Sequence, residues 1–362
     1  MDLVSFGSNS QYMSDKKNIR IKDIAQMAGV SVGTVDRVLH GRGRVSPDAA
    51  KKVEEVLAQT GYKPNLIART LGSNKTLRVA VLLPDPNQDE YWNLAQSGIE
   101  QSLDDWSYYD VEIECFYFDL YDAKSFEQTV HSTLSFEPDG VVLAPVFYQE
   151  STLLLESLST SKIPFVLFNS NIPASNPLCF IGQNLHQSGR VAAELISLGT
   201  TTSTNILVLH MYENLESSVY LKNKENGLRD FFKDSDYTIV SHDLTNPREI
   251  EAKVIEAITG NTRGIFVSTS TGTHIVASIL EKRGLSDLCL VGFDLLDENL
   301  KYLKKGTINF LINQNPKRMA KIGVNHLVNH LLFKKELPTE ETFPIEVITR
   351  ENMNSYLEST IH

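Results

Sequence analysis

The stretch from Ile21 to His40 constrains the fold of this chain most, because apolar residues recur at helical spacing on both sides of a glycine. Positions i, i+3, i+4 and i+7 form one apolar stripe on a first short helix, namely Ile21, Ile24, Ala25 and Ala28. Gly29 follows, where a helix end favours the left-handed conformation that glycine adopts readily. Ser31 can then cap a second helix by accepting a hydrogen bond from an unpaired amide. Two short helices joined in this way are typical of a helix-turn-helix.

The second helix is expected to have one buried face and one exposed face. Val35, Val38 and Leu39 are predicted to point inward. The residues predicted to face outward are Val32, Gly33, Asp36, Arg37 and His40. In a DNA-binding helix-turn-helix this exposed face would lie in the major groove. The alternative is a pair of packed helices without a role in DNA binding.

The residues that follow favour the DNA-binding interpretation. Ser46-Pro47-Asp48 predicts a third helix, since it combines a cap, a proline suited to the first turn and an acid near the positive end of the helix dipole. The buried stripe of this helix is expected at Ala50, Val53, Val56 and Leu57, and Gly61 is expected to end it. After Tyr62-Lys63-Pro64-Asn65, another short helix is predicted from Leu66 to Leu71.

The run IRIKDIAQMAGVSVGTVDRVLHGRGRVSPDAAKKVEEVLAQTGYKPNLIARTL, from Ile19 to Leu71, resembles the headpiece of the LacI/GalR family of bacterial repressors. In that family the segment matching Asn65 to Leu71 is a hinge helix that folds on the operator and wedges a leucine into the minor groove. The resemblance implies that Asn65, Ala68 and Leu71 contact DNA there. It also implies a homodimer, because two-fold proteins match palindromic operators.

The recognition face departs from the family pattern at its start. Val32 and Gly33 stand where many members have polar side chains. Gly33 has no side chain to reach a base edge, and Val32 can only touch apolar groups such as a thymine methyl. Sequence discrimination is therefore expected to depend on Thr34, Arg37 and His40. Contacts to phosphates, which position a protein without specifying sequence, are expected from Ser31, Arg42, Arg44 and Lys63.

The distribution of charge also indicates a nucleic-acid-binding segment. From Lys16 to Lys75 there are 12 Lys and Arg against 5 Asp and Glu, a balance of +7. The whole chain has a net charge of −11, so the remainder carries −18. A small basic module attached to a large acidic body is itself a sign of nucleic-acid binding.

A chain of 362 residues is too long for one small domain. We expect a disordered tail at 1–17, the helix-turn-helix domain at 18–64, the hinge helix and linker at 65–76, and an effector-binding and dimerisation domain at 77–362. The opening residues have no basic start and no apolar run, and no stretch approaches the roughly 20 apolar residues of a membrane span. Cys115, Cys179 and Cys289 lie far apart without metal spacing, which favours free thiols in a reducing cytoplasm.

From Arg78 onward, short apolar runs alternate with helical segments, which predicts α/β architecture with two doubly wound parallel-sheet lobes. Strands are expected at 78–84, 111–118, 140–145 and 164–169, and in a second series at 205–210, 237–242, 264–268 and 288–293. Residues 77–350 resemble the periplasmic sugar-binding protein type of domain that the LacI/GalR family joins to its headpiece, most closely in LVGFDLLDENLKYLKKGTINFLINQNP. The resemblance implies one lobe of residues 77–172 plus 316–335 and another of 173–315 plus 336–350. It places the chain crossings between the lobes near 170–176, 293–295 and 314–316.

Ligands of open α/β sheets bind beyond the carboxyl ends of the strands, so the loops there are the candidate effector site. From the resemblance, Tyr91 and Trp92 would cover the apolar face of a sugar, and Asp294 would accept hydrogen bonds from its hydroxyls. The residues expected to contact the effector are Asp85, Asp89, Tyr91, Trp92, Phe147, Asn169, Gln183, Lys224, Thr269, Ser270, Asp294 and Gln314.

Each of these positions also has a purely structural alternative. Asp294 could cap the next helix, Tyr91 and Trp92 could belong to the core, and Lys224 could lie on the surface. Thr269, Ser270 and Phe147 depart from the pattern of ribose-binding relatives, which carry Asn-Asp and another acid there. A different sugar, a sugar derivative or a less polar ligand therefore stays open.

No catalytic constellation, metal site or cofactor is expected. His326 and His330 are spaced i, i+4, but they have no HExxH frame and no evident third ligand. The sequence also lacks a P-loop, GxSxG and GxGxxG. The pattern as a whole predicts a cytoplasmic, ligand-responsive DNA-binding regulator, most simply a repressor. The alternatives are a sugar-binding receptor and a sugar-processing enzyme with an accessory headpiece.

Overall fold

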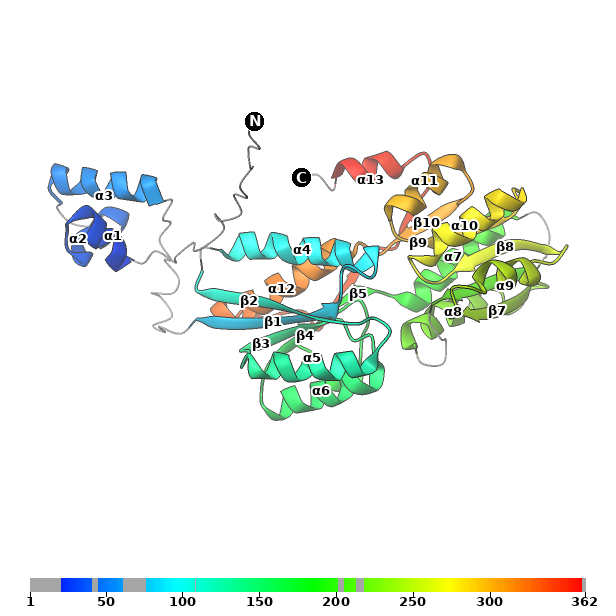
Figure 1. Cartoon of the computed structure of the whole chain (residues 1–362), viewed down its shortest axis with the longest axis horizontal. Helices are drawn as coiled ribbons and strands as arrows, with labels where there is room; N and C mark the ends of the chain where they lie inside the picture. The colour runs from blue at the N-terminus through cyan, green and yellow to red at the C-terminus, as the bar shows by residue number, and fades with distance from the viewer. Residues whose placement is uncertain are drawn as a thin grey trace, which may run out of the picture. The chain divides into compact units, whose positions relative to one another are not determined.

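The computed structural model describes residues 21–40, 45–60, 76–107, 109–200, 205–212 and 218–359. Its contacts separate an N-terminal unit, formed chiefly by residues up to Asn74, from a larger body that begins at Lys75 (Figure 1). The predicted tail and hinge helix lie outside the described residues. So do six predicted DNA contacts, namely Arg42, Arg44, Lys63, Asn65, Ala68 and Leu71.

The N-terminal unit contains the helix-turn-helix and the third helix that the sequence predicts. Its helices are α1 (Ile21–Ala28), α2 (Val32–His40) and α3 (Pro47–Thr60). Gly29 has a φ of +65°, and the hydroxyl of Ser31 caps α2 by accepting a hydrogen bond from the Thr34 amide at 3.1 Å. The apolar stripes meet in a core of Ile24, Ala25, Ala28, Val35, Val53 and Val56. The headpiece helices are therefore held together by the residues whose spacing predicts them.

The first lobe of the body is a parallel sheet with the strand order β11-β5-β4-β3-β1-β2. Its strands are β1 (Leu77–Pro84), β2 (Val111–Phe118), β3 (Gly140–Leu143), β4 (Phe165–Phe168), β5 (Cys179–Gln183) and β11 (Glu340–Phe343). Helices α4 (Glu90–Trp106) and α12 (Pro316–Phe333) cover one face, and α5 (Ala123–Ser135) and α6 (Tyr148–Thr160) cover the other (Figure 1). The central strands are almost wholly apolar because both of their faces are covered.

The second lobe has the strand order β12-β10-β9-β8-β6-β7, in which β10 and β12 pair antiparallel and the other neighbours pair parallel. Its strands are β6 (Asn205–Met211), β7 (Thr238–Leu244), β8 (Thr262–Val267), β9 (Cys289–Phe293), β10 (Phe310–Asn313) and β12 (Glu346–Ile348). Its helices are α7 (Leu185–Gly199), α8 (Val219–Phe231), α9 (Ile250–Ala257), α10 (Gly272–Arg283), α11 (Asp297–Lys305) and α13 (Met353–Ser359). A short 3-10 helix, η1 (Pro173–Ser175), precedes β5.

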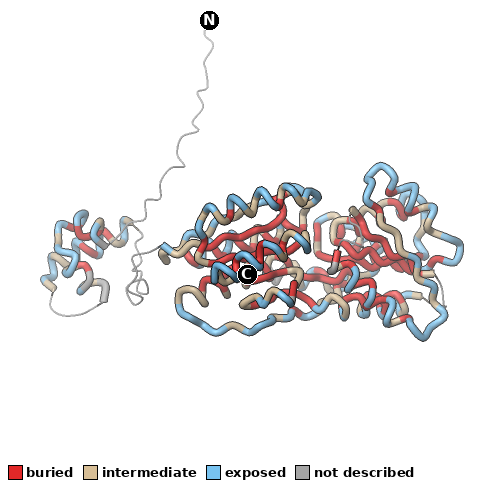
Figure 2. The backbone as a smooth tube through the Cα atoms, turned by 90° about the horizontal axis from the view of Figure 1, so that it is seen from below, coloured by how far each residue is buried: buried red, intermediate tan, exposed pale blue. Residues whose placement is uncertain are grey.

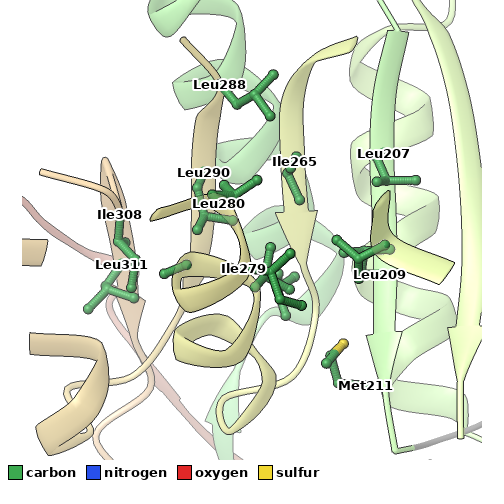
Figure 3. Packing of buried hydrophobic residues seen from close by; sticks show 14 of the residues in the cluster. Leu207, Leu209, Met211, Ile265, Ile279, Leu280, Leu288, Leu290, Ile308 and Leu311 are labelled. Carbon is green, nitrogen blue, oxygen red and sulfur yellow. The ribbon is translucent and has the colours of Figure 1, made fainter. Parts of the chain in front are cut away.

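Side chains on successive strand residues pack into opposite cores, as the period of two requires. In β6, Leu207 and Leu209 join one cluster, and Ile206 and Val208 join another under α7 and α8. Figure 3 shows Leu207 and Leu209 in the cluster that also contains Ile279 of α10. Figure 2 shows that the strands of both sheets are buried while the outer faces of the helices are exposed.

The chain passes between the sheets three times, after β5, after β10 and between β11 and β12. The crossing predicted near 314–316 is confirmed. Those predicted near 170–176 and 293–295 are wrong, because β5 is a further strand of the first sheet and β9 and β10 both belong to the second. Residues 173–183 and 336–343 consequently lie in the first lobe rather than the second.

The side chain of Gln183 ties the crossings together. It is buried at the end of β5, and its Nε2 donates to the carbonyl of Asn313 at 2.7 Å and to that of Pro344 at 2.9 Å. One amide group therefore joins all three crossings, and the geometry of the hinge depends on it.

The close packing of α7 against α8 predicts that a larger residue at their contact will destabilise the protein. A Cβ added to Gly189 would lie 1.8 Å from the carbonyl oxygen of Lys224, so Gly189→Ala should push the two helices apart. We expect it to lower the free energy of unfolding by about 1–3 kcal/mol, measured by urea denaturation. The control is Gly260→Ala, whose Cβ would meet nothing within 4 Å. Equal stability of the two variants would contradict this packing.

Candidate ligand cleft and nucleic-acid interface

A cleft opens between the two lobes at the carboxyl ends of their parallel strands, where ligands of such sheets bind. Its volume is about 630 Å³ with the open solvent at its mouth included. The lining residues are Asp89, Tyr91, Trp92, Leu120, Tyr121, Val146, Asn169, Ser170, Met211, Tyr212, Tyr220, Lys224, Thr269, Ser270, Thr271 and Gln314.

The cleft brings together eight of the residues singled out from the sequence. They are Asp89, Tyr91, Trp92, Asn169, Lys224, Thr269, Ser270 and Gln314. The other four lie elsewhere. Phe147 packs on Phe118 and Phe126 in the core of the first lobe, with ring centroids 6.0 Å apart in each pair. Asp85 accepts hydrogen bonds from Asn87 in its own turn, and Gln183 belongs to the hinge.

Asp294, the fourth of these, lies beneath the cleft rather than in its lining. The side chain is 0% exposed, and its Oδ1 accepts from the Gln314 backbone amide at 2.8 Å. Its Oδ2 accepts from Gln314 Nε2 at 2.6 Å and from the Ser270 hydroxyl at 2.5 Å. Burial raises the pKa of Asp294, and these hydrogen bonds oppose that rise. Asp294 was predicted to contact a ligand directly. The structure instead places it where it orients two side chains that line the cleft, those of Gln314 and Ser270.

Lys224 is the cation of the cleft, and it is only 2% exposed. Its ammonium donates to the carbonyl of Ser268 at 2.9 Å and lies 3.6 Å from the centroid of the Phe293 ring. The alternative of a surface lysine is thus wrong. An aromatic ring face at this distance attracts the ammonium group of a lysine.

A buried polar network supports the loop below Lys224. His210 contacts the Ser268 hydroxyl through Nδ1 and the Glu225 carboxylate through Nε2, both at 2.7 Å. Glu225 also accepts from Arg229 at 2.6 Å and from Ser241 at 2.7 Å. Although Ser268, His210 and Glu225 are the residue types of a nucleophilic triad, Ser268 is fully buried and no substrate carbon can reach it. The network therefore positions the loop rather than carrying out a reaction.

Tyr91 and Trp92 are largely core residues with one edge in the cleft. Both are buried, and their rings meet edge to face at 5.0 Å. The Tyr91 hydroxyl donates to Asn169 Oδ1 at 2.8 Å, which fixes the orientation of that amide. These aromatic rings therefore shape the cleft wall and orient a polar neighbour.

The hydroxyl group of Thr269 is a polar group of the cleft lining that a ligand could engage. The residue is 8% exposed and lines the cleft, yet its Oγ1 has no hydrogen-bond partner among the residues that the structure describes. A buried hydroxyl without a partner costs about 1–3 kcal/mol. A ligand hydroxyl in the cleft would remove that cost.

Two carboxylates of the first lobe reach across the cleft to the second. The Thr271 hydroxyl donates to Asp89 Oδ2, and the backbone amide of Asp297 donates to Glu90 Oε1 at 2.7 Å. Thr271 and Leu296, the N-cap residues of α10 and α11, make no capping hydrogen bonds with their own side chains. Because Asp89 and Glu90 engage these helix starts from the opposite lobe, they favour the closed cleft.

The cleft also contains residues that the sequence reasoning missed. They are Leu120, Tyr121, Val146, Ser170, Met211, Tyr212, Tyr220 and Thr271. The strand-end rule could have found Leu120 and Tyr121, because they follow β2. The backbone gives a second signal, because Asn169, Tyr212, Asp294 and Asn315 all follow strands and have φ values of 68°, 63°, 64° and 59°. Such conformations are uncommon in residues other than glycine and cluster at functional sites.

The candidate nucleic-acid interface is the outer face of α2. Gly33 and Arg37 are exposed there, and Val32 is 51% exposed at the first helical position. Thr34 is half-buried, and its hydroxyl lies 2.9 Å from that of Ser31. The side chain of His40 lies outside the described part of the chain. An apolar side chain exposed at this position suits contact with another molecule, such as a thymine methyl in the major groove.

The histidines considered as metal ligands have separate partners. His326 Nε2 contacts Glu341 Oε2 at 2.6 Å, and His330 Nδ1 contacts the carbonyl of Lys335 at 3.0 Å. Within the described ranges, no group of three potential ligands is positioned to hold a metal ion. Within the same ranges, no helix combines the length and hydropathy needed to cross a membrane.

Comparisons with known proteins match both parts of the chain. Residues 20–65 match the family model for bacterial regulatory proteins of the lacI family, and residues 79–335 match a periplasmic binding protein domain. Catabolite control protein A of Priestia megaterium is 32% identical over 287 residues, which cover 76% of this chain and 82% of the relative.

Solved structures give the same result. A Bacteroides fragilis protein described as a LacI transcriptional regulator has a TM-score of 0.72 and 30% identity, covering 78% of this chain and 100% of that one. A solute-binding protein of an ABC transporter from Burkholderia graminis, solved with D-arabinose, has a TM-score of 0.69 and 22% identity, covering 78% and 99% of the two chains. This second likeness shows the fold alone.

The hydrogen bonds around Glu225 predict how the stability of the folded protein depends on pH. Burial would raise the pKa of Glu225, but hydrogen bonds from His210, Ser241 and Arg229 lower it from 4.5 to about 2. A depressed pKa stabilises the folded state above the unfolded pKa, and this stabilisation is lost as the pH falls from 4.5 toward 2.

In urea unfolding at a series of pH values, Glu225→Gln should cost on the order of 3 kcal/mol near neutrality, and the difference from the wild type should shrink below pH 4.5. The exposed carboxylate variant Glu351→Gln is the control and should follow the wild-type profile. A Glu225→Gln deficit that stays constant down to pH 2 would contradict the ionised network.

Proposed function

We propose that this chain, which belongs to the lacI family of bacterial regulatory proteins and is a ligand-responsive DNA-binding transcription regulator, takes a sugar or sugar derivative as its effector. The effector lies in the cleft between the lobes and controls the affinity of the headpiece for operator DNA. The chain acts as a repressor in the cytoplasm, where its operator is. The observation that carries this proposal is a cleft between two lobes that is lined by hydroxyl and amide groups from both of them.

The polar groups of the cleft suit a polyhydroxylated ligand. Both lobes supply neutral hydroxyls and amides, namely Asn169, Ser170, Thr269, Ser270, Thr271 and Gln314. Sugar hydroxyls both donate and accept hydrogen bonds, and so do these hydroxyl and amide groups. Each group of the cleft can therefore pair with a sugar hydroxyl as a donor or as an acceptor.

The exposed face of α2 is proposed to read the operator, with Thr34, Arg37 and His40 discriminating between bases. Ser31, Arg42, Arg44 and Lys63 contact phosphates, and Asn65, Ala68 and Leu71 act in the minor groove. One headpiece reads only a half-site, so the working regulator is a homodimer on a palindromic operator.

Effector binding is proposed to act by changing the angle between the lobes. The hinge is a set of three crossings held by Gln183, and the closed cleft is favoured by Asp89 and Glu90. A ligand that contacts both lobes binds the closed form more tightly and therefore shifts the equilibrium toward it. In a homodimer, this change would alter the distance between the hinge segments of the two subunits. The affinity of the dimer for operator DNA would change with that distance.

A substitution of Arg37 tests whether α2 recognises the base sequence of the operator. On a duplex selected from a random-sequence pool with the wild-type chain, Arg37→Ala should lose about 1–3 kcal/mol of binding and show relaxed sequence preference. Binding is measured by gel shift at fixed salt. Lys51→Ala removes the same charge from an exposed site on α3 and should not change sequence preference. An equal loss by Arg37→Ala on every duplex would assign the residue to a phosphate contact.

Thr271 provides the test of ligand control. Thr271→Val keeps the shape of the side chain but removes the hydroxyl that donates to Asp89. We expect the Kd for a responding sugar to rise about tenfold, and the sugar-induced change in operator affinity to shrink, because the closed form loses a hydrogen bond.

The measurements are calorimetry and gel shift with a panel of monosaccharides. Thr342→Val, at an exposed position on β11, is the matched control and should respond normally. If no sugar in the panel changed either the melting temperature or operator affinity, the sugar effector would be excluded.

A further inference from the structure

Asn299 is a fully buried polar residue of α11, and its side chain joins two loops of the second lobe. Its Nδ2 donates to the carbonyl of Ser270 at 3.1 Å, and to those of Phe293 and Asp294 at 2.9 Å and 3.2 Å. Ser270 belongs to the loop between β8 and α10. Phe293 ends β9, and Asp294 begins the loop that leads to α11. One amide group on α11 therefore holds both loops.

Both loops contribute to the surface that a ligand would meet. Ser270 lines the cleft, and its hydroxyl donates to the Asp294 carboxylate. The same carboxylate accepts from the side-chain amide of Gln314, which also lines the cleft. Asp294 has a φ of +64°, a conformation that is uncommon in residues other than glycine. Because Asn299 bonds the carbonyls of Phe293 and Asp294, it holds this unusual turn in place.

The start of α11 is also a point at which the second lobe is bonded to the first. Glu90, in the first turn of α4, accepts from the backbone amide of Asp297 at 2.7 Å. Asp297 is the first residue of α11, and the N-cap residue Leu296 makes no capping hydrogen bond with its side chain. A carboxylate at a helix start pairs with its unbonded amides and complements the positive end of the dipole. Glu90 therefore caps α11 from the opposite lobe.

Asp297 and Asn299 belong to the same turn of α11 and are expected to move together. The amide of Leu300 donates to the carbonyl of Leu296 at 2.9 Å, which closes this first turn. Hydrogen-bonded networks and rigid helices can carry energetic coupling between separate sites. A displacement of the Asp297 amide, such as opening of the cleft would cause, is thus carried to the Asn299 side chain within one helical turn.

Building on the proposed function, in which the cleft closes on a ligand, we propose that Asn299 is a positioning residue that couples closure to the ligand-binding surface. While Glu90 holds the start of α11, Asn299 fixes the loop of Ser270 and the turn of Asp294. The side chains of Ser270 and Gln314 are then kept in one orientation. When the cleft opens, α11 loses its cap and these side chains gain freedom, so the second lobe binds a ligand most tightly in the closed form.

Hydrogen exchange of the full chain, measured by mass spectrometry without any sugar, tests this coupling. The Gln314 amide reports on the turn, because it donates to Asp294 Oδ1 at 2.8 Å. Glu90→Ala removes the bond between the lobes and should accelerate exchange of the peptide containing Gln314 about tenfold. The matched control is Glu100→Ala, which removes an exposed carboxylate from the same helix, where it accepts from Gln96, and should leave this exchange unchanged.

A double variant shows whether the effect passes through Asn299. The side chain of Asn299→Ser is too short to reach all three carbonyls, so exchange at Gln314 should already be fast in that variant. Adding Glu90→Ala should then change the exchange rate by less than about twofold, because coupled residues are not additive. Asn299→Thr is made as well, and the cycle is completed with whichever variant is more stable in urea denaturation. The same denaturation gives the global stability with which local exchange is compared.

A local acceleration that exceeds the change in global stability and disappears in the double variant would support the coupling. Equal exchange in Glu90→Ala and the wild type would overturn it, and so would effects of Glu90→Ala and Asn299→Ser that simply add. The proposed sugar effector is judged separately, because these measurements contain no sugar. It fails if the monosaccharide panel changes neither the melting temperature nor operator affinity.

Discussion

The carboxyl ends of the strands in both lobes point into a single gap, and the functional part of the body depends on this arrangement. Parallel strands end at the same edge of a sheet, so each lobe collects its loops there. Three crossings at one side bring the two edges face to face, and the Gln183 amide fixes the crossings to one another. Loops from distant parts of the chain, such as those at Asp89 and Thr271, become neighbours for this reason.

Within this gap two carboxylates, those of Asp89 and Asp294, accept hydrogen bonds from the protein itself. Leaving Asp294 buried and unpaired would be costly, and three hydrogen bonds from Gln314 and Ser270 offset that cost. The same bonds hold the two donor side chains rigidly. The cleft therefore presents the Gln314 amide and the Ser270 hydroxyl in fixed orientations, which discriminate by hydrogen-bond geometry.

Much of this architecture follows from local patterns in the sequence. The helix-turn-helix is predictable because Gly29 and Ser31 define its turn and the apolar stripe defines its core. Most strands are predictable as apolar runs. The strand β5 is not, because it follows a loop rich in proline and asparagine, and its omission misplaced a lobe boundary.

The roles of individual site residues were harder to predict, because they depend on contacts distant in sequence. Phe147 and Asp294 both follow strands, as ligand contacts do, yet one packs in the core and the other lies beneath the cleft. Only the partners that the fold brings to them, Phe118 for the first and Gln314 for the second, distinguish these roles. A rule based on strand ends identifies the loops but not which side chain in each loop faces the ligand.

Two hydrogen bonds across the cleft, among the residues that the structure describes, make the closed body controllable. Asp89 with Thr271 and Glu90 with the Asp297 amide are polar contacts, each with a net stabilisation of about 0.5–1.5 kcal/mol, or more where the carboxylate is charged. A closed form held by a few kcal/mol remains within reach of the differential binding energy of one small ligand. A large apolar interface between the lobes would fix the cleft in one state, and ligand binding could then change nothing at the headpiece. Polar contacts between the lobes therefore serve regulation, and the apolar cores of the lobes serve folding.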